Sequence, residues 1–213
     1  MSFDILAPYY RGMELILAGG KMHRCRTAFL EQIPSPANIL LLGEGHGRSL
    51  VEHHRRFPEA QITCVDASAG MLAQARRQLA RYGLKPGGVE FIHADILDWV
   101  PRAKSYDLIV TNYFLDCFRA DQLERIIPKI AGLASPGANW LIADFKIADR
   151  GWKRVRSRAI LELLYQFFRV VTRLPADRLT KPDPLLEKVG FTLSRRSERE
   201  WGLLHSDWWR KTA

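Results

Sequence analysis

The chain has 213 residues, of which 47% are hydrophobic and 26% are charged, and its formal net charge is +9. This composition is typical of a globular protein and excludes an intrinsically disordered chain. No run approaches the ~18 consecutive apolar residues of a membrane-spanning helix, and no basic stretch precedes an apolar core as in a signal peptide. The length suits one domain, so we expect a single domain over residues 1–213.

The positive charge lies mainly in the last third of the chain. Residues 1–146 contain 17 basic and 15 acidic side chains, whereas residues 147–213 contain 15 and 8. An electrostatic partner is therefore expected at the C-terminal third. Cys25, Cys64 and Cys117 are scattered without C-x-x-C spacing, so we interpret them as thiols of a protein in a reducing cytoplasm. No His and Cys spacing indicates zinc, and we expect no metal.

Strand-like apolar runs alternate with helical patterns along the chain. A helix is expected from an N-cap at Ser68 to a stop at Gly83, and another from about 121 to 133, with a kink at Pro128. The alternation predicts an α/β fold with a doubly wound, mostly parallel, Rossmann-like sheet. The expected parallel strands are 39–42, 62–65, 89–93, 107–111 and 139–143.

The pattern changes after Gly190. Two strand-like runs, FTLSRRS and EWGLLHS, follow one another there. They predict a C-terminal antiparallel hairpin that turns at Glu198–Arg199.

Three alternating glycines follow the first predicted strand, in ILLLGEGHG at 39–47. Glycine weakens a strand and supplies no side chain that could pack. The presence of Gly43, Gly45 and Gly47 at the end of a strand therefore requires another explanation. In a doubly wound sheet, ligands bind beyond the carboxyl ends of the strands, where a bare backbone lets a ligand approach closely. The amides at the start of the next helix can then face a polar or anionic group. The spacing favours a nucleotide-like ligand over a turn without a ligand.

Two carboxylates end successive predicted strands. Asp66 can accept both hydroxyls of a ribose, and Asp95 can accept an adenine amino group while Ile96 packs on the ring. Either residue alone could be a helix N-cap, but their recurrence favours an adenosine. The glycines depart from the dinucleotide pattern G-x-G-x-x-G, because Gly47 comes one residue early.

With these residues assembled, the chain resembles class I S-adenosylmethionine-dependent methyltransferases. ILLLGEGHG, VDAS, ADI, YDLIVTNY and LASPGANWLIADF follow the order of the family's motifs over nearly the whole chain. Leu41 stands where the family usually has an acid, a role that Glu44 could partly fill. The resemblance implies S-adenosylmethionine as cofactor, bound by Tyr10, Gly43, Glu44, Gly45, Gly47, Asp66, Ala67, Met71, Asp95, Ile96 and Asn112.

The N-terminal segment resembles the opening of ubiquinone/menaquinone-biosynthesis-type methyltransferases. Arg11 and Glu14 depart from that pattern, where Asp and Asn are usual. The resemblance implies a helical cap over residues 1–32, in which Tyr10 closes over the cofactor and Tyr9 contacts the acceptor. The alternative is that both tyrosines are half-buried aromatics at a helix end. The matching residues are Phe3, Ala7, Tyr10, Met13 and Arg26.

Candidate catalytic groups lie on loops near the predicted site. They are Asp116 in TNYFLDCF, Asp144 in ADFK and His205 in LLHSDWW. A base is needed only if the acceptor loses a proton around methyl transfer. The alternatives are an N-cap, a solvated strand end and a hairpin residue, respectively. Tyr113 and Asp116 are also expected to contact the acceptor.

Residues 151–189 form a predicted helical insertion whose helix ends before Pro175. Glu162, Gln166, Arg169 and Arg173 make one narrow polar stripe, and most of the remainder of 160–174 is apolar. We expect this helix to roof the acceptor pocket, with Phe167 facing the acceptor. The alternative is a core helix with a solvated start. The basic start could also meet an anionic membrane surface; it contains Arg150, Trp152, Lys153, Arg154, Arg156 and Arg158.

The expected function is methyl transfer to a small apolar or aromatic acceptor, such as a quinone-like, phenolic or lipid precursor. One alternative is an RNA or other nucleic-acid methyltransferase that uses the basic C-terminal third. We consider it less favoured, because TNYF lacks the Asn/Asp-Pro-Pro-aromatic pattern of base-amine methylating enzymes. Another is a non-catalytic nucleotide-binding Rossmann protein or a nicotinamide oxidoreductase. We expect a cytoplasmic monomer or homodimer that can lie at the membrane periphery.

Overall fold

The computed structural model describes residues 20–84, 87–101, 105–172, 176 and 178–212. Tyr9 and Tyr10, which the resemblance assigns to acceptor and cofactor, lie outside the described residues. Of the predicted N-terminal cap over residues 1–32, the structure describes α2 (Lys21–Arg26) and the short 3-10 helix η1 (Leu30–Gln32).

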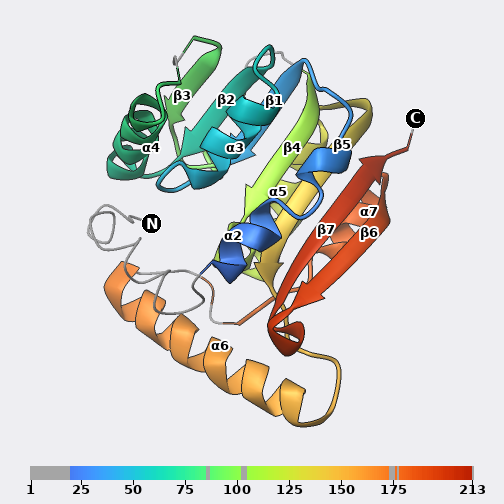
Figure 1. Cartoon of the computed structure of the whole chain (residues 1–213). Coiled ribbons are helices and arrows are strands. Elements are labelled where there is room, and N and C mark those ends of the chain that lie inside the picture. The colour runs from blue at the N-terminus through green and yellow to red at the C-terminus, as the bar shows by residue number, and fades with distance from the viewer. Residues whose placement is uncertain (1–19, 85–86, 102–104, 173–175, 177, 213) are drawn as a thin grey trace.

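A seven-stranded sheet forms the centre of the molecule (Figure 1), in the order β3-β2-β1-β4-β5-β7-β6. The first five strands are parallel, and β7 runs antiparallel to both β5 and β6. The predicted doubly wound, mostly parallel sheet with a C-terminal hairpin is confirmed. The strands are β1 (Asn38–Leu42), β2 (Gln61–Asp66), β3 (Val89–His93), β4 (Tyr106–Asn112), β5 (Ala134–Phe145), β6 (Phe191–Arg199) and β7 (Leu204–Lys211).

The hairpin turns later than the sequence predicts. Glu198 pairs with His205, and Arg199 pairs with Leu204, so both predicted turn residues belong to the ladder of β6. The turn is instead made by the 3-10 helix η3 (Glu200–Gly202). Charged residues on an outermost strand can remain in the ladder because one side of that strand faces solvent.

Helices connect the parallel strands, as the alternation predicts. The Ser68 hydroxyl caps α4 by accepting a hydrogen bond from the Met71 amide at 3.1 Å, and Gly83 follows this helix with φ of +66°. The predicted N-cap and stop are therefore confirmed. The remaining elements are α3 (Arg48–Arg56), α4 (Ala69–Arg81), η2 (Leu115–Cys117), α5 (Ala120–Ala131), α6 (Gly151–Thr172) and α7 (Asp183–Lys188).

Successive residues of β1 pack on opposite faces of the sheet, as pleating requires. Leu40 and Leu42 join the core cluster that contains residues of α5 and α7. Ile39 and Leu41 join the cluster that contains residues of η1, α3 and α4. Leu41 is 1% exposed, so the position where the family usually has an acid is part of the apolar core here.

Helix α6 lies beyond the carboxyl ends of the parallel strands and covers neither face of the sheet (Figure 1). Its inner side contributes Leu161 and Tyr165 to a third core cluster, which also contains Met22 of α2 and Leu204 of β7. The helix is therefore attached to the carboxyl edge of the sheet through this inner side.

Gly47 is required by packing between two helices. It precedes α3 with φ of +88°, and a Cβ atom there would lie 2.6 Å from the Ala75 Cα of α4. Real Cβ atoms do not approach another carbon so closely, so α3 and α4 can pack in this way only with glycine at position 47.

We expect Gly47→Ala to destabilise the fold by more than the ~1–2 kcal/mol that a left-handed non-glycine residue costs. The measurement is the free energy of unfolding in urea. Gly137→Ala is the matched control, because Gly137 has φ of +72° and a Cβ there meets nothing within 4 Å. Equal losses in the two variants would show that the contact with Ala75 has no energetic importance.

Candidate functional site

A cavity opens at the carboxyl edge of the sheet between β1 and β4, where the strand order reverses and doubly wound folds bind ligands. We call it the strand-end cavity. Seven predicted cofactor residues line it, together with Tyr113. Its lining residues are Leu42, Gly43, Gly45, Val65, Asp66, Ala67, Met71, Ala94, Asp95, Ile96, Tyr113, Phe114, Cys117 and Phe118.

Asp66 and Gly45 form the polar side of the strand-end cavity. The Asp66 carboxylate accepts hydrogen bonds from the Gly45 amide at 3.1 Å and from the Ser68 amide at 2.8 Å. Gly45 has φ of +65°, and a Cβ there would meet nothing within 4 Å. A carboxylate therefore lies beside bare backbone and open space, which suits a ligand with hydroxyl groups. These residues fit the ribose of an adenosine cofactor.

The end of β3 forms the next part of the same cavity. Asp95 accepts a hydrogen bond from the Leu97 amide at 3.0 Å, and Ile96 is 4% exposed at the edge of the main core. A carboxylate acceptor next to an apolar side chain suits an adenine ring, as the sequence predicts.

Gly43 lacks a side chain for a different reason. Its φ is +65°, and a Cβ there would overlap the ring of Phe114. Phe114 and Phe118, whose ring centroids are 5.1 Å apart, form an aromatic wall of the strand-end cavity. Sequence reasoning missed both residues and Cys117, although the aromatic run TNYFLDCF directly after a buried strand indicates such a wall.

Three predicted cofactor residues support the cavity without lining it. The Glu44 carboxylate accepts a hydrogen bond from the Leu50 amide of α3 at 2.8 Å, and burial raises the pKa of Glu44 to about 7. Asn112 donates a hydrogen bond to the Ser49 hydroxyl at 3.0 Å. Gly47 packs against α4. Glu44 and Asn112 fix the start of α3, and the contact of these three residues with the cofactor stays a prediction.

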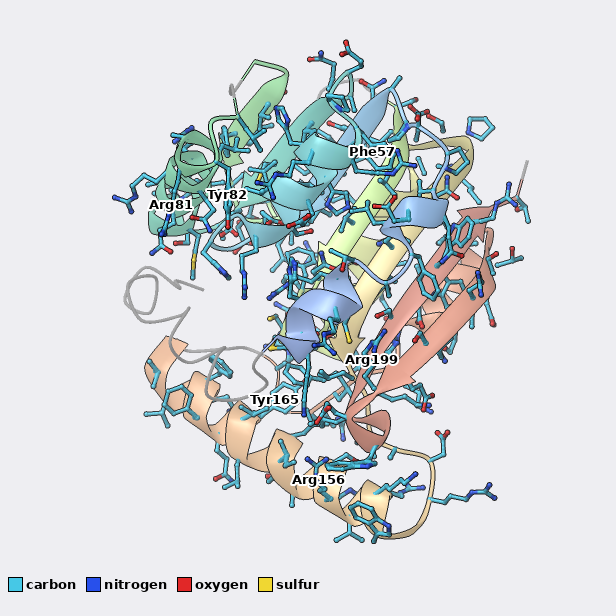
Figure 2. All side chains as sticks on the ribbon, viewed as in Figure 1. Phe57, Arg81, Tyr82, Arg156, Tyr165 and Arg199 are labelled. Atoms are coloured by element: carbon cyan, nitrogen blue, oxygen red, sulfur yellow. The ribbon has the colours of Figure 1, made fainter. Side chains whose placement is uncertain are left out.

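Phe167, which the sequence predicts at the acceptor, lies on the outward side of α6, and its contact with an acceptor stays a prediction. Its side chain is 44% exposed and belongs to the side of α6 opposite Leu161 and Tyr165. The sequence pattern could not distinguish the two apolar sides of this helix, because both recur at helical spacing. Figure 2 shows Tyr165 directed from α6 toward the body of the protein, and its hydroxyl donates a hydrogen bond to the Asp116 carbonyl at 3.1 Å.

Asp116, Asp144 and His205 come together in one buried cluster. The Asp116 amide donates a hydrogen bond to the Asp144 carboxyl at 3.2 Å, and Asp144 pairs with His205 across β5 and β7. The three residues are 9%, 3% and 5% exposed. The alternative of a solvated strand end for Asp144 is therefore wrong, whereas His205 is a residue of the hairpin, as its alternative predicts.

The cluster continues into a network of ion pairs on the hairpin. The His205 Nδ1 lies 3.0 Å from the Asp207 carboxylate. Arg196 donates two hydrogen bonds to Asp207, at 2.6 and 2.7 Å, and one to Asp183 at 2.8 Å. Such a bidentate pair is strong and directional. The hydrogen bond to Asp183 fixes the hairpin relative to α7, and Arg196 holds the pKa of Asp207 below its ordinary value despite burial.

Burial changes the protonation of the two central carboxyls. Desolvation raises the pKa of Asp116 to about 6. Desolvation and the neighbouring Asp116 charge raise the pKa of Asp144 well above its ordinary value. Two buried carboxyls in contact do not both ionise, because their charges repel. The pair therefore shares one proton near neutral pH.

The cluster does not face the strand-end cavity directly. Asp144 and His205 line a neighbouring cavity of about 270 Å³ at the ends of β5 and β7, which we call the β5–β7 cavity. Asp116 lies behind Cys117, whose thiol donates a hydrogen bond to its carboxylate at 3.5 Å. The three catalytic candidates are thus brought together one residue away from the wall where the cofactor residues lie.

The shared proton predicts a pH dependence of stability. The folded state binds more protons than the unfolded chain above about pH 4, so this pair destabilises the fold as pH rises through about 6. Asp144→Asn removes the extra proton and keeps a neutral side chain. We expect the variant to gain ~1–3 kcal/mol in free energy of unfolding relative to wild type between pH ~4 and ~7.

Urea unfolding at several pH values measures this difference. Asp121→Asn is the control, because Asp121 is exposed and its pKa is lowered by a hydrogen bond from Arg119. A gain with rising pH in this control, or none in Asp144→Asn, would contradict the shared proton.

Known proteins match this sequence over the part of the chain that forms most of the strand-end cavity. Residues 39–137 match the family described as methyltransferase domain. The trans-aconitate 2-methyltransferase of Acidovorax sp. (strain JS42) is 42% identical over 79 residues, which are 37% of this chain and 28% of that protein. The trans-aconitate 2-methyltransferase of Escherichia fergusonii is 37% identical over 95 residues, which are 45% of this chain and 34% of that protein. The chain thus spans about a third of the length of these curated relatives.

Similar solved structures cover the whole chain. The mitomycin 7-O-methyltransferase MmcR has a TM-score of 0.70 at 20% identity, covering 100% of this chain and 61% of that one. The Burkholderia thailandensis 1,6-didemethyltoxoflavin-N1-methyltransferase, solved with bound 1,6-didemethyltoxoflavin and S-adenosylhomocysteine, has a TM-score of 0.67 at 18% identity. The match covers 99% of this chain and 86% of that one.

The relatives named here are not of the ubiquinone/menaquinone-biosynthesis type that the N-terminal segment resembles, and that finer resemblance stays a prediction. The match over residues 39–137, the sheet order and the strand-end cavity agree with one another. Residues 39–137 are therefore similar to the methyltransferase domain family, and the chain has the Rossmann-like fold of the solved methyltransferases.

Proposed function

We propose that this protein transfers a methyl group from S-adenosylmethionine to a small-molecule acceptor. The observation that carries the proposal is the open space at Gly45 beside the Asp66 carboxylate, at the point where the strand order reverses. S-adenosylmethionine is the cofactor that a methyltransferase domain of this fold uses, and it supplies an electrophilic methyl group on a sulfonium.

The residues of the strand-end cavity have distinct roles in this proposal. Asp66 accepts the ribose hydroxyls, Asp95 accepts the adenine amino group, and Ile96 packs on the ring. Phe114 and Phe118 exclude water from the side of β4. Much of the acceleration of such a reaction comes from holding the two reactants in line in a dry site. The proposal adds Tyr10 as a residue that closes over the cofactor, on the resemblance of the N-terminal segment alone.

The acceptor that we propose is neutral and aromatic or otherwise apolar, such as a phenol, a reduced quinone or a lipid precursor. The wall beyond the cofactor consists of Tyr113, Phe114, Cys117 and Phe118, with a carboxylate, Asp116, directly behind it. A tricarboxylate such as trans-aconitate would meet like charge there, and its desolvation would require basic partners. The wall itself is mostly apolar, and we favour an apolar acceptor although the Arg26 guanidinium lies 5.0 Å from the centroid of the Tyr113 ring.

We assign the Asp116–Asp144 pair a positioning role. Cys117 separates the pair from the strand-end cavity, and a general base must lie within hydrogen-bond reach of the proton that it removes. The pair instead joins the loop after β4 to β5 and, through Tyr165, to α6. Asp144→Asn should accordingly leave kcat within a few-fold of wild type and leave its pH profile unchanged.

Formation of S-adenosylhomocysteine, measured by mass spectrometry with a panel of acceptors, tests the proposed chemistry. We expect turnover with phenols or reduced quinones, and none with trans-aconitate or RNA. Methylation of trans-aconitate at a comparable kcat/KM would contradict the proposed acceptor class while leaving methyl transfer intact. Absence of S-adenosylmethionine binding in titration calorimetry would contradict the proposal as a whole.

Gly45→Ala tests the cofactor site itself. Its Cβ would project into the open space of the strand-end cavity, so we expect S-adenosylmethionine to bind at least about tenfold more weakly, ~1.4 kcal/mol. Gly83→Ala is the matched control, since Gly83 has φ of +66° and also meets nothing within 4 Å, but lies outside the cavity. Both variants should lose similar stability, and only Gly45→Ala should lose affinity in calorimetry.

Asp66→Ala is expected to weaken the same binding by ~1–3 kcal/mol, the scale for removing a buried hydrogen-bond partner. Asp98→Ala is a control on the loop after β3, because Asp98 is exposed and does not line the strand-end cavity. Wild-type affinity in folded Asp66→Ala would refute the assigned role of this carboxylate.

A further inference from the structure

Helix α6 is apolar on two opposite sides. Leu161 and Tyr165 on the inner side are buried in the third core cluster. The other side presents a row of exposed apolar residues at intervals of three or four, which places them along one line of the helix. We call this row the outer face of α6; it consists of Trp152, Val155, Ala159, Leu163, Phe167 and Val170.

The outer face is unusually exposed for such large apolar side chains. Val155, Leu163 and Val170 are 71%, 68% and 84% exposed. Exposed apolar residues are normally scattered singly, whereas a contiguous row marks a surface that contacts something else. Elsewhere among the described residues, Tyr82, Val100 and Leu193 are the large exposed apolar side chains away from this region, and they belong to different elements.

The hairpin extends the outer face at the start of α6. Trp201 is 55% exposed, and its ring centroid lies 6.0 Å from that of Trp152. Glu200 and Trp201 have φ of +54° and +56°, a conformation that is costly for residues other than glycine. The Arg156 guanidinium lies over the Trp201 ring at 4.7 Å. A strained turn thus holds a second tryptophan beside the first.

Basic side chains outnumber acidic ones around the outer face, and Asp149, Glu198 and Glu200 near its start each pair with a lysine. Glu162 is the only acidic residue of α6. Figure 2 labels Arg156 and Arg199, which lie on α6 and on the adjoining strand β6. Tryptophans, an apolar row and flanking basic side chains are the combination found in helices that lie in a membrane interface. The basic residues in and next to α6 are Arg150, Lys153, Arg154, Arg156, Arg158 and Arg169.

We propose that the outer face of α6, together with Trp201, docks onto the surface of an anionic lipid bilayer. The apolar row enters the interface between headgroups and acyl chains, and the basic side chains contact anionic headgroups. No helix among the described residues is long and apolar enough to cross a membrane, so the contact is peripheral. This inference does not depend on the proposed acceptor.

Two other partners fit these observations less well. A second copy of the chain, pairing α6 with α6, would bring the basic residues of both helices together with one glutamate on each side to offset them. Like charges in such an interface are unfavourable. RNA would engage the basic residues, but valine and leucine side chains neither contact phosphates nor stack on bases as aromatic rings do.

Vesicle flotation of the full chain tests the proposal. Vesicles of phosphatidylcholine alone and of phosphatidylcholine with phosphatidylglycerol are compared at low and high salt. We expect wild type to bind the anionic vesicles at low salt, and Leu163→Gln/Val170→Gln to lower the partition coefficient about tenfold or more. Val100→Gln is the matched control, because Val100 is also 84% exposed but lies outside α6; it should bind like wild type.

A second pair of variants tests the charges. Lys153→Gln/Arg158→Gln should lower binding to anionic vesicles about tenfold or more at low salt, and have little effect at high salt. Arg77→Gln/Arg81→Gln removes two exposed charges from α4, which lies beside β3 and apart from α6 (Figure 1), and should reduce binding less. Equal losses in the two pairs would reduce the effect to net charge and overturn the assignment to α6.

Tryptophan emission gives an independent measurement on folded protein. Anionic vesicles should shift the emission of wild type to shorter wavelength, and the shift should be smaller in Trp152→Phe. The proposal is overturned if wild type ignores anionic vesicles at low salt, or if RNA competes the protein off them. It is also overturned if sedimentation shows a dimer that Leu163→Gln/Val170→Gln dissociates, which would assign the face to a second copy.

Discussion

The hydrogen bond from the Gly45 amide to the Asp66 carboxylate joins two loops on which the site depends. It ties the turn after β1 to the end of β2, beside the point where the strand order reverses. Because Asp66 also accepts from Ser68, the same carboxylate sets the start of α4. A side chain on either element can therefore face the strand-end cavity only while this contact holds.

The acidic cluster at the ends of β4, β5 and β7 fixes the opposite side of that edge. Asp116, Asp144 and His205 are buried together, and Arg196 joins Asp207 to Asp183. Buried charges are expensive unless they are paired or neutralised. In this cluster the cost is offset by the bidentate ion pair between Arg196 and Asp207 and by the proton that Asp116 and Asp144 share. The placement of the cluster attaches the hairpin and α6 to the parallel sheet.

The three glycines illustrate how far a motif can be interpreted before the fold is known. Their alternation predicts a ligand-binding edge, because glycine is costly there without a reason, and the structure places a cavity at that edge. The reasons differ, however: Gly43 accommodates Phe114, Gly47 accommodates Ala75 of α4, and only Gly45 borders open space. Glu44 and Asn112 were likewise expected at the cofactor, yet they hold the start of α3. Spacing along the chain does not say which neighbour a bare backbone position faces.

The sequence by itself determined the order of strands and helices, the parallel sheet and the residues at the ends of β1, β2 and β3. These features follow from local periodicity, capping and the alternation of apolar runs, which act over a few residues. Only the tertiary structure decided that Asp144 is buried against Asp116, that Phe114 covers Gly43, and that one apolar side of α6 faces outward. Those outcomes depend on contacts between segments far apart in the chain, and a helix with two apolar sides carries no local signal of which side the core will bury.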